Sequence, residues 1–327
     1  MALPLTLACW DYDRTRALAD GTIRPEGIDL TCLPLAPEET FFRMARHREF
    51  DVAEMSLSSY VLSLADADPP FVALPVFPSR SFRHSCIFVR RGSGIESPAQ
   101  LRGGRIGVPE YQITACGWIR GILAEHHDVP VDSVTYVRGG LEDPRRVEKV
   151  ALSLPPSIRV ESLPEGTTLS QQLAAGELDA IYTARAPSTF RTGEVERLFA
   201  DPEAVERAYF AETGIFPIMH VVVLRRDVYE RNPWIAQSLL KAFTAARDDA
   251  VQRLFETTAL RVALPWVTVQ AERTVALMGD DFWSYGLEPN RTVLETFLRY
   301  SAGQGLGRAD LVPEDLFVPE ALESFAI

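Results

Sequence analysis

The sequence predicts a two-lobed α/β protein, and three observations carry this prediction. Apolar runs typical of strands alternate with segments whose apolar residues recur at helical spacing, which favours largely parallel sheets. At 327 residues, the chain is longer than a single hydrophobic core usually supports. Two apolar strands, in "HSCIFVRR" at 84–91 and "HVVVLRR" at 220–226, each lead into a basic pair and are candidate crossings between lobes. We therefore expect lobe one to comprise 1–88 and 221–327, lobe two to comprise 89–220, and a ligand cleft to lie between them.

Lobe one is expected to begin with a strand at 5–10, followed by a strand in "PEGIDLTCLPL" and a short helix in "EETFFRMARHREF". The next strand, 51–54, leads directly into a helix with apolar residues at helical spacing. After the second crossing, "NPWIAQSLLKAF" predicts a further helix, with Asn232 as its cap and Pro233 at its first position.

The inserted lobe is expected to contain a strand at 106–108 followed by a helix in "TACGWIRGILAEHH". Residues 139–166 are rich in proline, glycine and charge, which predicts a long loop with one short strand around 158–161. A helix closed by Gly176 then leads into a strand at 180–183.

Composition excludes several classes of protein. A net charge of -12 argues against a nucleic-acid partner, so an anionic ligand would need a local group of arginines. The four cysteines stand apart without metal-ligand spacing, which fits a reducing compartment. The first residues lack a signal-peptide pattern, and no apolar run approaches a membrane span. We therefore expect a cytoplasmic protein with no membrane partner; its oligomeric state is left open, with a homo-oligomer as one alternative.

Long blocks of the chain resemble the 4,5-dihydroxyphthalate decarboxylase family: "DYDRTRALADGTIRPEGIDL", "FFRMARHREFDVAEMSLSSY", "FPSRSFRHSCIFVR", "GVPEYQITACGWIRGIL", "TGIFPIMHVVVLRRDVYERNPW" and "GDDFWSYGLEPNRTVLETFLRYS". The segment "GSGIESPAQLRGGRIGVP" resembles the start of the second lobe in type II periplasmic-binding-protein folds. The resemblance implies this fold and an aromatic ortho-dicarboxylate catechol as the small-molecule partner. The implied reaction converts 4,5-dihydroxyphthalate to protocatechuate and CO2.

The residues fit decarboxylation through the phenol of the substrate. Lysine is scarce, with only Lys149 and Lys241, which argues against a Schiff base. Histidine motifs of metal sites are missing, so we expect no cofactor, with assistance by a divalent ion as the open alternative. Each carboxylate of 4,5-dihydroxyphthalate is para to a hydroxyl. Protonation of the carboxylate-bearing carbon therefore gives a dienone, which regains aromaticity as CO2 leaves.

This chemistry needs a base and an acid. His84 and His220 precede the two crossing strands, and we favour His84 as the acid because Arg80 and Arg83 are its neighbours in the sequence. Glu54 and Glu110 end strands on the cleft side and are the candidate bases. The alternative for each histidine is a hydrogen-bonded residue at the interface of the lobes.

Substrate contacts are expected from arginines that suit carboxylates and from residues at strand-to-helix turns. These candidates are Arg80, Arg83, Arg14, Asp11, Ser56, Ser58, Tyr111, Thr114 and Arg185. The alternatives are structural ion pairs for the arginines and helix capping for the hydroxyls. The aromatic residues at 282–285 are expected to be a packed segment and not a stacking platform for the ligand.

Two other classes of function have the same fold. A solute-binding protein would use the same arginines but would require export, for which no signal is visible. Another small-molecule enzyme, such as a dehydratase, is the third class. Product analysis with 4,5-dihydroxyphthalate distinguishes these classes.

Overall fold

The structure is a computed structural model that describes residues 2–145 and 152–322. Contacts divide the chain into two units. Unit 1 comprises Met1–Arg80, Ile218–Glu295 and Val312–Ile327, and unit 2 comprises Ser81–Pro217 and Thr296–Leu311. No helix among the described residues is long and apolar enough to cross a membrane.

The units differ from the expected lobes at three places. Residues 218–220, which were expected in lobe two, belong to unit 1. Residues 81–88 belong to unit 2, where strand β5 (Ile87–Arg90) pairs with β9 (Ala180–Tyr182) and β10 (Val195–Arg197). Residues 296–311 also belong to unit 2 because Phe297 and Tyr300 pack against Trp118. The chain therefore passes between the units at four points, after residues 80, 217, 295 and 311, where two were expected.

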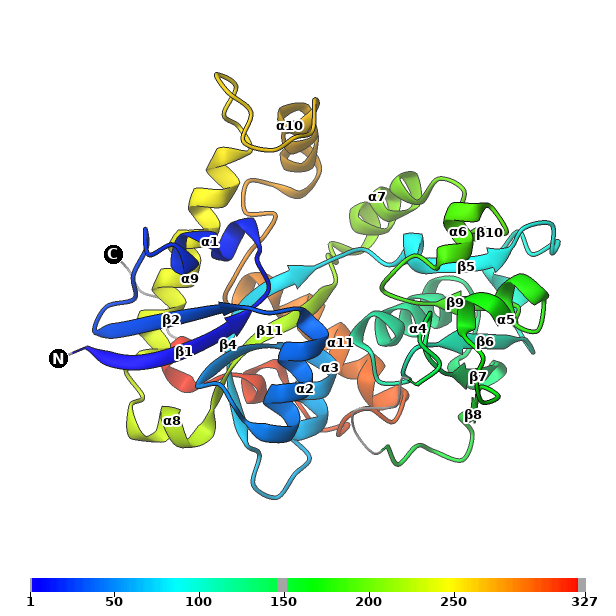
Figure 1. Cartoon of the computed structure of the whole chain (residues 1–327), viewed down its shortest axis with the longest axis horizontal. Coiled ribbons are helices and arrows are strands. Elements are labelled where there is room, and N and C mark those ends of the chain that lie inside the picture. Colours follow the sequence, from blue (N-terminus) through cyan, green and yellow to red (C-terminus); the bar gives the residue numbers. More distant parts are fainter. Residues whose placement is uncertain (1, 146–151, 323–327) are drawn as a thin grey trace. The chain divides into compact units, whose positions relative to one another are not determined.

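Unit 1 is built on a mixed sheet (Figure 1). Its five described strands run in the order β2-β1-β3-β11-β4. β1 is parallel to β2 and β3, whereas β11 is antiparallel to both of its neighbours. The strands are β1 (Leu3–Cys9), β2 (Ile28–Pro34), β3 (Val52–Ser56), β4 (Phe71–Arg80) and β11 (Ile218–Arg225).

The helices of unit 1 follow the strands closely in sequence, and α1 and α9 pack against each other. The helices are α1 (Asp13–Ala19), α2 (Pro37–His47), α3 (Leu57–Ser63), α8 (Arg226–Arg231), α9 (Ile235–Arg253) and α10 (Val267–Met278), with short 3-10 turns η4 (Glu288–Asn290), η5 (Pro313–Leu316) and η6 (Pro319–Ala321). Asn232 was expected to cap α9. Its side-chain amide instead donates to the carbonyl of Val228 at the end of α8, so this prediction was wrong.

Unit 2 has a sheet of its own, with the six described strands in the order β10-β5-β9-β6-β7-β8. β9, β6, β7 and β8 are parallel, and β5 is antiparallel to both neighbours. The remaining strands are β6 (Arg105–Val108), β7 (Thr135–Arg138) and β8 (Arg159–Ser162). The short strand expected around 158–161 is thus confirmed as β8.

The helices of unit 2 are α4 (Thr114–His126), α5 (Leu169–Ala175), α6 (Ser188–Thr192), α7 (Pro202–Thr213) and α11 (Arg291–Gly303, from Thr296 onward), with the 3-10 turns η1 (His84–Cys86), η2 (Pro98–Leu101) and η3 (Val131–Ser133). Gly176 ends α5 with a left-handed φ of 83°, as predicted. The hydrophobic core of unit 2 includes Phe88, Val137, Leu169, Leu173 and Ile181.

Gly121 allows α4 and α11 to approach closely. A Cβ atom at this position would lie 2.0 Å from Cδ2 of Tyr300. We expect Gly121→Ala to lower the free energy of unfolding by about 1–3 kcal/mol, because overpacking outweighs the gain in helix propensity. Urea unfolding measures this loss. Gly303→Ala, at the end of α11 with open space around its Cβ, is the matched control and should be neutral; equal effects of the two changes would contradict the prediction.

Candidate active site

The register of unit 1 brings Glu54 and His220 together. In the antiparallel pair of β3 and β11, His220 lies opposite Ser56 and Val222 lies opposite Glu54. Glu54 and His220 are therefore diagonal neighbours, and side chains two positions apart on a strand share one face of the sheet. Their side chains meet, with Nδ1 of His220 2.5 Å from Oε1 of Glu54.

Glu54 accepts three further contacts. The hydroxyl of Tyr12 donates to Oε1 at 2.6 Å, and the backbone N–H of Trp10 donates to Oε2 at 3.0 Å. The thiol of Cys9 is 3.6 Å from Oε2. The register explains these contacts, because Ala8 on β1 pairs with Ala53 on β3 and the chain leaves β1 beside Glu54. A fully buried carboxylate is thus surrounded by donors.

Glu54 is ionised in this setting. Burial alone would raise its pKa, but the charge and hydrogen bond of His220, with the bonds from Tyr12 and Trp10, outweigh burial and hold the pKa below its ordinary value. Burial and the Glu54 carboxylate raise the pKa of Tyr12 well above its ordinary range, so Tyr12 keeps its proton. Because an ionised carboxylate only accepts hydrogen bonds, Nδ1 of His220 carries a proton.

This arrangement engages Nδ1 of His220 and leaves Nε2 outside the network around Glu54. Among the described residues, Nε2 makes no hydrogen bond, while the ring is held edge-on by Phe41 at 4.9 Å. The His220 side chain is 18% exposed, whereas Glu54 is fully buried. A carboxylate that fixes the orientation of an imidazole and stabilises its protonated form makes that imidazole an effective proton-transfer group.

Arg14, a predicted substrate contact, lies beside this network. Its guanidinium carbon is 4.1 Å from the centroid of the Tyr12 ring, and its Nη1 pairs with Asp13 at 3.0 Å. Asp11, another predicted contact, forms an exposed ion pair with Arg16 at 2.8 Å. The structure therefore brings Arg14, but not the carboxylate of Asp11, into contact with a residue that binds Glu54.

The two serines lie at the start of α3. Ser56 caps this helix, accepting from the N–H of Ser59 at 3.5 Å, which is the capping alternative stated for it. Ser58 is fully buried in the first turn.

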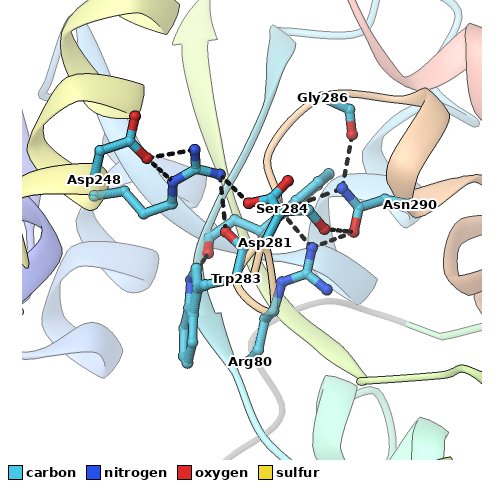
Figure 2. A network of polar contacts seen from close by, with 9 residues as sticks. Arg80, Asp248, Asp281, Trp283, Ser284, Gly286 and Asn290 are labelled. Carbon is cyan, nitrogen blue, oxygen red and sulfur yellow. Dashed lines mark hydrogen bonds and ion pairs between the residues drawn. The ribbon is translucent and has the colours of Figure 1, made fainter. Parts of the chain in front are cut away.

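Arg80, at the end of β4, binds the segment before α11 (Figure 2). Its Nη2 donates to the carbonyl of Ser284 at 2.7 Å and to the side-chain oxygen of Asn290. The Asn290 amide donates in turn to the carbonyls of Ser284 and Gly286 at 3.2 and 2.8 Å. Burial lowers the pKa of Arg80 to about 9, so the group remains cationic at neutral pH. These contacts with residues 284–290 were not anticipated.

His84 lies in a different environment from His220. It is 2% exposed and packs against the rings of Tyr209, Phe199 and His127 at 5.1, 5.5 and 6.3 Å. Neither ring nitrogen has a hydrogen-bond partner among the described residues. Burial, with the neighbouring His127 and His126, lowers the pKa of His84 to about 4. The neutral imidazole is therefore a poor proton donor near pH 7, which argues against the prediction of His84 as the acid.

The remaining predicted residues lie in unit 2. Arg83, Glu110, Tyr111 and Thr114 are all buried, and Arg185 is exposed after β9. The Tyr111 hydroxyl donates to the carbonyl of Gln304 at 3.2 Å, and Thr114 is the first residue of α4. Glu110 lies next to this helix in sequence.

Lys241 is not among the residues that contact Glu54. Lys241 is exposed on α9, and Lys149 lies outside the described residues. Within residues 2–145 and 152–322, no group of three or more His, Cys, Asp and Glu side chains is arranged to hold a metal ion.

Comparison with known proteins identifies the family. No family model matches the chain. Over 327 aligned residues, the chain is 44% identical to a 4,5-dihydroxyphthalate decarboxylase from Comamonas testosteroni, covering 99% of each protein. The chain belongs to the 4,5-dihydroxyphthalate decarboxylase family. A family member from Pseudomonas putida is 47% identical over 210 residues, which cover 64% of this chain and 81% of that protein.

Solved structures confirm the fold class of this family member. A chain described as the periplasmic sulfonate-binding protein SsuA from Methylobacillus flagellatus KT aligns with a TM-score of 0.57 and 13% identity, covering 98% of this chain and 92% of that one. A desulfurization enzyme aligns with a TM-score of 0.52 and 17% identity, covering 98% and 97%. At these identities the likeness shows the fold alone, which is periplasmic-binding-protein-like.

Two residues of this site were missed in the sequence of the decarboxylase family member. Tyr12 stands between Asp11 and Asp13 directly after the first predicted strand, the position from which ligand contacts were expected. A hydroxyl that can donate a hydrogen bond, at this position after the strand, is the sequence feature that could have identified Tyr12 as a site residue. Trp283 was assigned to packing, yet its ring lies 4.2 Å from the guanidinium carbon of Arg14. No local pattern marks that contact, because the two residues are far apart in the chain.

Proposed function

We propose that the protein decarboxylates 4,5-dihydroxyphthalate to protocatechuate and CO2. The observation that supports this most strongly is the buried Glu54 carboxylate with His220 at 2.5 Å, in a chain 44% identical to a decarboxylase of that name. The pair supplies an oriented proton-transfer group, which the reaction through a dienone requires.

In the proposed mechanism, electron density from the para hydroxyl moves into the ring as a proton is added to the carboxylate-bearing carbon. His220 delivers this proton from Nε2, and Glu54 holds the ring and stabilises its protonated form. The C–H bond forms first. The bond to the carboxylate then breaks, its electron pair returns to the ring and CO2 leaves. The base that removed the proton of the para hydroxyl as the dienone formed returns a proton to that oxygen, which restores the phenol.

The second proton-transfer role is assigned to Glu110, the remaining predicted base, because Glu54 is already bound to His220, Tyr12 and Trp10. The proposed anchors for the carboxylates are the predicted arginines Arg14, Arg80, Arg83 and Arg185, which can form paired hydrogen bonds. The proposed reaction uses no cofactor.

Incubation of the purified full chain with 4,5-dihydroxyphthalate tests this proposal. We expect protocatechuate and CO2 in equal amounts, measured by chromatography and by trapping of the gas. The same rate after dialysis against EDTA fits the route without a metal, whereas a rate restored only by a divalent ion rejects that part. Binding without product would support a solute-binding protein, and neither binding nor product would reject the substrate.

The partner proposed for the protein is thus a small aromatic dicarboxylate, and the net charge of -12 disfavours nucleic acid. The cytoplasm is the proposed location. It fits Cys9, Cys32, Cys86 and Cys116, each of which is a free thiol.

A further inference from the structure

Arg14 is held by more contacts than a surface ion pair provides. Its guanidinium carbon lies 4.1 Å from the Tyr12 ring centroid and 4.2 Å from the Trp283 ring centroid. Nε donates to the carbonyl of Pro78 at 2.6 Å, and Nη1 donates to Asp13 at 3.0 Å. Only 16% of the side chain is exposed. The two rings and the hydrogen bonds donated by Nε and Nη1 together fix the plane of the guanidinium.

Trp283 is itself fixed in place. Its indole N–H donates to the carbonyl of Phe77 at 3.0 Å, and its own carbonyl accepts from Nη1 of Arg247 at 3.2 Å. The same nitrogen of Arg247 binds Asp281 at 3.0 Å. The following residue, Ser284, accepts from Arg80 (Figure 2). The backbone is thus bound at the carbonyls of Trp283 and Ser284, and the indole N–H is bound as well, which gives the ring a defined position against Arg14.

The position of Arg14 suits an anionic ligand. Tyr12, on which it stacks, donates to Glu54, and Glu54 binds His220. Within the described part of the chain, Nη2 of Arg14 makes no hydrogen bond, while Nε and Nη1 are both engaged. A fixed cation therefore lies against Tyr12, which is bound to the carboxylate that holds His220.

We propose that Arg14 binds a carboxylate of the aromatic dicarboxylate through Nη2, and that Trp283 is the positioning residue that holds the guanidinium for this contact. The inference rests on the proposed function, because that function names the dicarboxylate. Trp283 acts through Arg14 and does not touch the reacting atoms. Arg80 and Asn290 support it by fixing the adjacent backbone.

Binding of phthalate by the full chain, measured by calorimetry, tests the coupling. Phthalate carries both carboxylates and lacks the hydroxyls needed for the reaction. We expect Arg14→Lys, which keeps the charge and loses the planar group, to weaken binding at least about tenfold. Trp283→Ala should weaken it about three- to thirtyfold, the range of a cation–π contact. Trp283→Phe should recover most of that loss, because it restores a stacking ring.

The double variant decides whether Trp283 acts through Arg14. Arg14→Lys combined with Trp283→Ala should bind phthalate as Arg14→Lys does, whereas losses that add would overturn the inference. With 4,5-dihydroxyphthalate, Trp283→Ala should raise KM and leave kcat within a few-fold. A fall in kcat at unchanged KM would also overturn it. Trp266→Ala, at a tryptophan that is 68% exposed, is the matched control and should change neither constant.

The two proposals fail in different ways. The wild-type chain could bind phthalate, and the variants could show the expected coupling between Arg14 and Trp283, while the wild type released no CO2 from 4,5-dihydroxyphthalate. That result would reject the proposed reaction and support the role of Trp283. If the Trp283→Ala variant decarboxylated the substrate normally, with unchanged KM, the role of Trp283 would be rejected. The proposed reaction would still be supported.

Discussion

Replacing His220 with glutamine is expected to lower kcat for 4,5-dihydroxyphthalate by about 10²- to 10⁴-fold, the usual contribution of a general acid. Glutamine can keep a hydrogen bond to Glu54, but it cannot take up and release a proton at the position of Nε2. KM should change much less than kcat, because the arginines that bind the carboxylates are untouched. Steady-state kinetics with 4,5-dihydroxyphthalate measures both constants.

His84→Gln is the matched control for this variant, since it makes the same substitution at the other histidine that the sequence singles out. We expect its kcat to remain within a few-fold of wild type at neutral pH, because the buried imidazole of His84 is already neutral there. The assignment would be reversed by a large loss in His84→Gln with near-normal turnover in His220→Gln. If both variants kept their turnover, a carboxyl such as Glu110 would be the acid.

The contrast between the two histidines shows what the sequence can predict. Both precede an apolar strand, and the sequence favoured His84 because Arg80 and Arg83 are its neighbours. Glu54 is separated from His220 by 166 positions, and their pairing depends on the register of β3 and β11. β11 also shifts register against β4 on both sides of His220. Such irregularities move side chains between faces and are not encoded in alternation alone.

The elements themselves were more predictable than their contacts. The strand predicted at 51–54, which the structure places at Val52–Ser56, the helix beginning directly after it and the left-handed glycine at the end of α5 follow from hydrophobic period and turn chemistry. Arg80 was expected on the substrate. Its observed partners, Ser284 and Asn290, lie 204 and 210 positions away in the sequence. A local sequence pattern cannot predict contacts over such a separation.

The lobe boundaries show the same limit. Residues 296–311 join unit 2 because Phe297 and Tyr300 complete a cluster with Trp118, and Tyr300 fits against Gly121. The helical spacing of α11 predicts a buried face but does not say which sheet or helix covers it. Neither composition nor a linker sequence therefore predicts that the chain returns to unit 2 after residue 295.

His84 is expected to make the stability of the protein sensitive to mild acid. Its pKa is lowered from 6.5 to about 4 in the folded chain, chiefly by burial. Between these values the unfolded chain binds a proton that the folded chain does not, so stability falls as pH falls from about 6.5 to about 4 and this contribution is constant outside that window. The full loss is about 3 kcal/mol, since one pKa unit corresponds to about 1.4 kcal/mol.

His84→Phe isolates this contribution. Phenylalanine fits the aromatic surroundings formed by Tyr209, Phe199 and His127, and it has no proton to gain. The other charged or titrating groups nearby are His126, and Glu206 and Arg197, which bind the backbone of Ser85; all remain in the variant. Urea unfolding at pH 7.5 and pH 4.5 should therefore show a smaller loss of stability in His84→Phe than in wild type. His47→Phe, at an exposed histidine, should behave as wild type, and an unchanged loss in His84→Phe would mean that His84 gains its proton in the folded chain.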